Sequence, residues 1–141
     1  MEVVKLLLDK GADSDPQIYD YGFYSDQGTA LQYAARAGNF EIAELMLERG
    51  PMVNAVGPES KMFGRTPLET AALYGSLDIV QLFPDAGADN QLSPKRRYAS
   101  ALRIAKEDYF EPNFGIVKLL EEYRQEALDE WNSARILELD S

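Results

Sequence analysis

The feature that most constrains the fold of this sequence is a short apolar pattern that recurs four times. Each copy has apolar residues at its second, third, fifth and sixth positions, the spacing of the buried stripe of a short helix. The copies are EVVKLLL at 2–8, EIAELML at 41–47, DIVQLFP at 78–84 and GIVKLLE at 115–121. Their starts are 39, 37 and 37 residues apart, so the pattern predicts one helix of a unit that repeats along the chain.

A second string recurs ahead of these segments and predicts a partner helix. Its copies are TALQYAARAG at 29–38, TPLETAALYG at 66–75 and, more weakly, SALRIAK at 100–106. The hydroxyl residue that opens each string, Thr29, Thr66 or Ser100, suits a helix N-cap. Gly38 and Gly75 can adopt a left-handed conformation that ends the helix and turns the chain back. The unit is therefore predicted to be an antiparallel helix pair.

These strings, in this order, resemble the ankyrin repeat family, whose helix pairs open with a TPLH-like string and close with a GAD-like turn into a projecting loop. The resemblance covers residues 2 to about 123. It implies an all-α ankyrin-repeat solenoid of stacked antiparallel helix pairs with projecting loops. Because the family repeat is about 33 residues long, the wider spacing here predicts lengthened loops. The predicted units are a half repeat at 1–13 and repeats at about 28–54, 64–90 and 98–123.

Two departures from the family pattern affect the local structure. The usual His of the TPLH-like string is replaced by Gln32, Glu69 and Arg103, so the hydrogen bonds of that His cannot be carried over. Pro84 stands late in a predicted second helix, where it lacks an amide donor and crowds the preceding turn. We therefore expect that helix to end early or to kink.

The two ends of the sequence predict different features. The chain opens on a second helix without a first helix before it, so we expect its apolar edge to meet upstream ankyrin repeats or a second copy. Residues 124–141 continue the last helical pattern with Leu128, Trp131 and Ile136 near helical spacing and an acidic opposite face. This segment is predicted to be a long C-terminal capping helix and tail that covers the open end of the stack.

The repeat pattern also separates core residues from candidate binding residues. Residues on the paired helix stripes are predicted to form the core: Leu31, Ala35, Ile42, Leu45, Leu68, Ala71, Ile79 and Leu82. In the ankyrin family, binding usually involves the projecting loops and the exposed surface of the first helices. On this chain those positions are Tyr19, Tyr21, Phe23, Tyr24, Arg36, Met62, Phe63, Arg65, Leu73, Tyr74, Arg97 and Tyr98.

The aromatic first loop is the most unusual part of this set. Four aromatic residues stand within the six positions 19–24, and Tyr in particular supplies rigid contact area with a polar tip. The alternative is that some of these rings pack on the first helices or on an upstream repeat. Lys95, Arg96 and Arg97 form the basic cluster of the third loop, which is short for a nucleic-acid or nuclear-import signal, so a solvated loop is the favoured interpretation.

Composition narrows the function classes. The formal net charge is −10, which argues against nucleic-acid phosphates or an anionic membrane as partners and favours a neutral or basic protein. The sequence has no His, which excludes the commonest general base and the usual zinc sites. It also has no Cys and no apolar run long enough for a membrane span, so an intracellular location, cytoplasmic or nuclear, is expected.

Three functions remain open at this point. The leading hypothesis is a non-catalytic protein-interaction module without a cofactor or metal. The second is an architectural segment or regulatory tail of a larger array that associates through its N-terminal edge; the lengthened loops are similar to those of ankyrin arrays in fungal multidomain proteins. The third is a small-molecule binder or enzyme that uses Tyr24, Tyr74 or Glu69 as acid or base, for which the sequence holds no phosphate loop, metal-ligand spacing or activated nucleophile.

Overall fold

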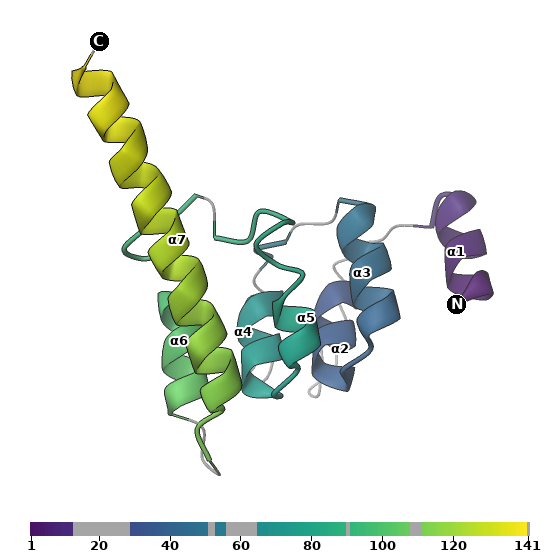
Figure 1. Cartoon of the computed structure of the whole chain (residues 1–141). Helices are drawn as coiled ribbons and strands as arrows, with labels where there is room; N and C mark the ends of the chain where they lie inside the picture. The colour runs from purple at the N-terminus through teal and green to yellow at the C-terminus, as the bar shows by residue number, and fades with distance from the viewer. Residues whose placement is uncertain (13–28, 51–52, 56–64, 90, 108–110, 141) are drawn as a thin grey trace, which may run out of the picture.

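The computed structural model describes residues 1–12, 29–50, 53–55, 65–89, 91–107 and 111–140, and within them every regular element is a helix. The helices lie side by side in chain order, as Figure 1 shows. Their bounds are α1 Glu2–Asp9, α2 Ala30–Ala37, α3 Phe40–Glu48, α4 Pro67–Leu73, α5 Leu77–Val80, α6 Ala99–Lys106 and α7 Phe114–Leu139. The all-α prediction is confirmed.

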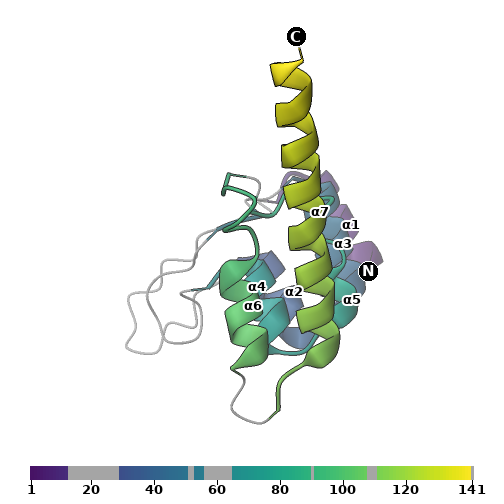
Figure 2. The ribbon, with the colours of Figure 1, turned by 60° about the vertical axis from the view of Figure 1, so that its left-hand side comes forward.

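The helices form two rows. The first helices α2, α4 and α6 pack on one another in sequence, and α3, α5 and α7 form the second row behind them. The view in Figure 2 looks along the stack and shows α7 in front of the second row. Each row is made of equivalent positions in successive helix pairs, as the repeat pattern predicts.

The predicted N-caps are correct at two of the three first helices. Thr29 Oγ1 accepts a 3.2 Å hydrogen bond from the Gln32 amide, and Gln32 Oε1 accepts one of 2.7 Å from the Thr29 amide. Thr66 and Glu69 form the same reciprocal pair, at 3.2 and 3.0 Å. Both are capping boxes, which satisfy two backbone donors that a helix start otherwise leaves unpaired.

The predicted cap at Ser100 is wrong. Helix α6 begins at Ala99, and its N-cap is Tyr98, two residues before Ser100. Tyr98 has a φ of +60°, in the left-handed region that non-glycine residues seldom adopt, and its side chain makes no capping hydrogen bond. Ser100 therefore lies inside the first turn of the helix.

The turns between paired helices depend on glycine as predicted. Gly38 and Gly75 have φ values of +67° and +75°. A Cβ at Gly75 would stand 3.3 Å from the Asn113 side-chain amide, which caps α7 in the next helix pair. Successive turns therefore pack closely, and the positive φ of Gly75 is the feature that favours glycine here.

The helix that was predicted to include Pro84 ends before it, as expected. Helix α5 stops at Val80, and the chain continues through tight turns to Asp89. Backbone hydrogen bonds three residues apart, such as Leu82 N to Ile79 O at 3.0 Å, replace the α-helical ones. These turns bury Phe83 completely, so the short helix still contributes a large side chain to the core.

The core lies between the two rows of helices. Six of the eight predicted core residues are buried, namely Leu31, Ala35, Leu45, Leu68, Ala71 and Ile79. Ile42 and Leu82 are only partly buried, but they pack against this cluster. The small Ala residues at the first helices allow their close approach in the row.

Helix α7 is longer than the stack that it joins. It buries Ile116, Leu120 and Ala127, and its final turns project past the other helices, as the yellow end of the ribbon in Figure 1 shows. Trp131 and Ile136 were expected to cover the end of the stack. They are instead 45% and 60% exposed, because no described helix lies beside this half of α7.

Candidate functional site

Half of the twelve predicted binding residues lie in the described part of the chain. Tyr19, Tyr21, Phe23, Tyr24, Met62 and Phe63 lie outside the described residues. The other six fall in three separate places: beside the ends of α2 and α4, at the start of α4, and beside α7.

The first place is a cation–aromatic contact between neighbouring helix pairs. Arg36 lies in the last turn of α2, and Tyr74 is the residue at which α4 ends. The Arg36 guanidinium carbon lies 5.9 Å from the centroid of the Tyr74 ring, within the range of a cation–π interaction. Tyr74 is 43% exposed and its neighbour Leu73 is half-buried.

Tyr33 belongs to the same surface, although the sequence interpretation missed it. It stands three residues before Arg36 on α2, a spacing that places two side chains on one helix face, and it is exposed. That spacing is the signal that could have found it. Tyr33, Arg36, Leu73 and Tyr74 together are called the Arg36–Tyr74 surface below.

Arg65 lies apart from that surface. It immediately precedes the N-cap of α4, whereas Tyr74 stands at the other end of this helix, which has seven residues and is about 10 Å long. The Arg65 carbonyl accepts a 2.6 Å hydrogen bond from Gln32 Nε2. Its backbone is therefore part of the contact between repeats.

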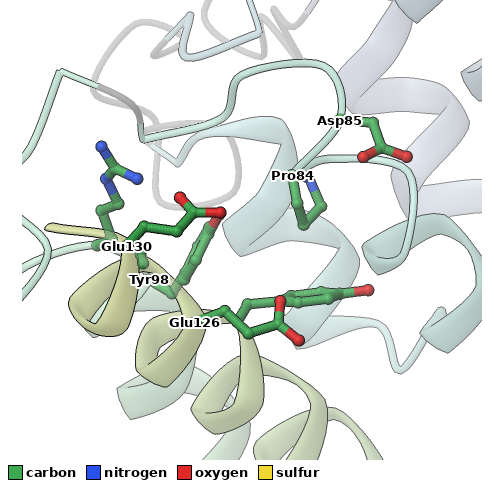
Figure 3. A pocket seen from close by; sticks show the side chains of 8 residues that line it. Pro84, Asp85, Tyr98, Glu126 and Glu130 are labelled. Atoms are coloured by element: carbon green, nitrogen blue, oxygen red, sulfur yellow. The ribbon is translucent and has the colours of Figure 1, made fainter. Parts of the chain in front are cut away.

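Arg97 and Tyr98 lie beside α7. They line a pocket between α7 and the connection from α5 to α6, with a volume of about 520 Å³, which is in the size range of ligand sites. Figure 3 shows its carboxylates and the Tyr98 ring around the opening. This α7 pocket is lined by Pro84, Asp85, Arg97, Tyr98, Tyr123, Glu126, Ala127 and Glu130.

Tyr98 is held in place by burial, an aromatic contact and a hydrogen bond to its backbone. Only 4% of it is exposed, and its ring lies 6.1 Å from that of Tyr123, tilted by 57°. Its backbone N–H donates a 3.1 Å hydrogen bond to Asp89 Oδ2, while the Asp89 N–H donates one of 3.0 Å to Asn54 Oδ1. The turns of successive repeats are thereby linked, and Tyr98 is fixed as a wall of the pocket.

Burial also changes the acid–base properties of this wall. It raises the pKa of the Tyr98 phenol, and the nearby charge of Arg97 opposes this only in part. The phenol therefore stays protonated at neutral pH and can donate a hydrogen bond. The carboxylates of Asp85, Glu126 and Glu130 are exposed at the rim.

The sequence interpretation missed most of the α7 pocket. Glu126 and Glu130 are spaced to share one face of α7, but nothing local in the sequence connects them with Asp85 or Tyr98. Glu69, considered as an acid or base, is instead the partner of Thr66 in a capping box. Within the described residues, no group of three or more acidic side chains has the arrangement of a metal site.

Comparison with known proteins decides the family. A family model described as ankyrin repeats, with three copies, matches residues 1–93 of the 141. The chain belongs to the ankyrin-repeat family. Ankyrin repeats are generally protein–protein interaction modules and are typically non-catalytic. Helices α6 and α7 lie beyond the matched range, so this ankyrin-repeat chain has its α7 pocket at the border of the recognised repeats.

Two curated relatives come from Caenorhabditis elegans. The ankyrin repeat and KH domain-containing protein mask-1 is 34% identical over 73 residues, which are 52% of this chain and 3% of that protein. A homologue of transient receptor potential cation channel subfamily A member 1 is 35% identical over 79 residues, which are 56% of this chain and 6% of that protein. The chain thus matches only a few per cent of the length of either relative. Among its own described residues, no helix has the length and apolar character that crossing a membrane requires.

Proposed function

We propose that this ankyrin-repeat chain is a non-catalytic interaction module that holds a neutral or basic protein against its first helices and the loops beside them. The observation that carries the proposal is the contact of Arg36 with Tyr74 across two adjacent repeats. Tyr and Arg are the residues most often found as energetic anchors in protein interfaces. A partner laid across α2 and α4 would contact both.

The contact also favours binding by ordering the side chains beforehand. An exposed cation–π pair contributes only about 0.5–1 kcal/mol to folding, so its main effect is to restrict Arg36 and Tyr74. Both belong to short helices that capping hydrogen bonds and close packing hold in place. Less conformational entropy is then lost when a partner binds.

The test is affinity capture with the intact chain and with Arg36→Ala/Tyr74→Ala, followed by binding measurements on purified components. Lys118→Ala/Glu122→Ala is the matched control, because it removes an exposed ion pair, of 3.8 Å, on α7 and outside this surface. We expect the affinity for a directly bound partner to fall about tenfold or more in the first variant. The control should bind that partner with unchanged affinity. Equal binding by the chain and the first variant, or loss only in the control, would overturn the proposal.

A second candidate function is supported by the outer face of α1. Val3, Leu6 and Leu7 are 68%, 57% and 55% exposed, and one ion pair of 2.6 Å joins Asp9 to Arg49 of α3. This apolar face suits packing on a further ankyrin repeat or on a second copy of the chain. Self-association predicts a dimer in sedimentation velocity that Leu6→Lys/Leu7→Lys converts to monomer. A monomer at every concentration would reject it.

A further inference from the structure

The α7 pocket has a negative charge that its own side chains do not balance. Three carboxylates line it, from Asp85, Glu126 and Glu130, against the single guanidinium of Arg97, which leaves a formal charge of −2. Within the described part of the chain, none of the three carboxylates forms an ion pair. Arg97 Nε instead donates a 3.3 Å hydrogen bond to the Leu92 carbonyl.

The Tyr98 hydroxyl adds a second polar feature to the pocket. Tyr98 as a whole residue is 4% exposed, and Figure 3 shows its side chain reaching toward the same opening as Glu130. Because the hydroxyl reaches this opening and no hydrogen bond joins it to another described residue, it is available to a ligand that enters the pocket.

An apolar stripe begins at the edge of the pocket. The residues that α7 buries against the stack, Leu120 and Ala127, are followed on the same helix face by Trp131. Trp131 is 45% exposed, and the Arg135 guanidinium carbon lies 4.7 Å from the centroid of its ring. A ligand in the pocket that continues along this face of α7 would thus meet the Trp131 ring after the carboxylates.

We propose that the α7 pocket binds the ammonium group of a lysine in a basic, partly apolar peptide segment, whose apolar residues pack against Trp131. The site is distinct from the Arg36–Tyr74 surface and does not depend on it.

The arrangement of the pocket favours lysine over other cations. Asp85 comes from the α5–α6 connection and the two glutamates come from α7, so the carboxylates approach from different elements. An ammonium with three rotatable donors can pair with whichever of these separate carboxylates it reaches, whereas the planar fork of arginine needs two acceptor oxygens side by side. The Tyr98 hydroxyl can accept one of these donors. The adjoining stripe selects a peptide rather than a small polyamine, which has no apolar side chains to bury.

The probe is a fluorescein-labelled helical peptide of leucine and lysine, compared with the same peptide in which glutamate replaces lysine. Anisotropy measures the binding, and Trp131, the single tryptophan of the chain, reports it independently by its fluorescence. We expect saturable binding of the lysine peptide only. Glu126→Gln/Glu130→Gln should weaken it about tenfold or more, because two charged hydrogen bonds are lost, and Tyr98→Phe should weaken it severalfold.

Glu44→Gln/Glu48→Gln is the matched control, since it changes the net charge equally on exposed positions of α3. The control should bind the lysine peptide as the unmodified chain does. Equal weakening by both double variants, or by neither, would overturn the site. If spermine changed the fluorescence of Trp131 but the lysine peptide did not bind, the α7 pocket would bind a small polyamine and not a peptide. Urea unfolding of each variant confirms that the fold is retained.

Discussion

The side-chain amide of Gln32 donates a 2.6 Å hydrogen bond to the carbonyl oxygen of Arg65, which lies 33 residues further along the chain. The same amide nitrogen donates a 3.2 Å bond to the Ala55 carbonyl, while Oε1 accepts from the Thr29 amide. One fully buried side chain therefore caps its own helix and holds the chain that leads into the next repeat. It occupies the place of the usual ankyrin His.

We expect Gln32→Leu to lower the free energy of unfolding by about 2–4 kcal/mol, because buried backbone groups lose their hydrogen-bond partners. Gln32→His should retain most of the stability if a ring nitrogen reaches the same carbonyls. Urea unfolding followed by circular dichroism measures both changes. Arg103→Leu at the equivalent exposed position of α6 is the control, with an expected change within about 0.5 kcal/mol. A Gln32→Leu variant as stable as that control would contradict the structural role.

The replacements of the usual His in the TPLH-like strings illustrate what local patterns can predict. Thr29 and Thr66 are followed three residues later by Gln32 and Glu69, which is the capping-box signature, so the helix starts could be read from the sequence. Ser100 looks equivalent, but the N-cap of α6 is the left-handed Tyr98, two residues earlier. That conformation results from tertiary contacts of Tyr98, which a local pattern does not contain.

This difference between two hydroxyl residues gives a second prediction. Thr66→Ala removes a cap and should lower the free energy of unfolding by about 1 kcal/mol, within the usual range for N-caps. Ser100→Ala should change it by less than about 0.5 kcal/mol, because Ser100 is an exposed residue inside the helix and Ala has the higher helix propensity. Urea unfolding of both variants measures these changes. Similar losses of unfolding free energy in the two variants would show that Ser100 is the N-cap of α6.

The candidate sites differ in the same way. Arg36 and Tyr74 could be predicted as neighbours because the repeat places the ends of successive first helices side by side. The α7 pocket could not, because Asp85 and Tyr98 reach α7 only through the turns that follow the short α5. Pro84 indicated that α5 would end early, but it did not indicate where the chain would go next.

Asp89 provides a prediction about pH. Burial raises its pKa above the ordinary value of 3.8, and this outweighs the opposing effects of the Tyr98 N–H and of Arg97. The folded chain therefore binds this proton more tightly than the unfolded chain does. Its contribution to stability is largest below pH 3.8 and falls as the pH rises through the raised pKa.

Asp89→Asn keeps a side-chain oxygen for the Tyr98 amide and tolerates the φ of +58°, but it cannot ionise. We expect the variant to be at least as stable as the unmodified chain at neutral pH, with an advantage that shrinks toward pH 3.8. Urea unfolding of both proteins across this range tests the sign. An advantage that instead grows as the pH falls would show that ionised Asp89 stabilises the fold.

The two halves of α7 should differ sharply in their effect on stability. Leu120 is fully buried against the stack, whereas Leu137, on the projecting half, is 72% exposed. Leu120→Ala should lower the free energy of unfolding by about 2–5 kcal/mol, since it removes buried contacts and leaves a cavity. Leu137→Ala, with the same chemical change on the same helix, should stay within about 0.5 kcal/mol. Thermal and urea unfolding of the isolated chain measure the contrast. If Leu137→Ala proved equally destabilising, the projecting half of α7 would be packed in solution, which would contradict the exposure of Leu137 in the structure.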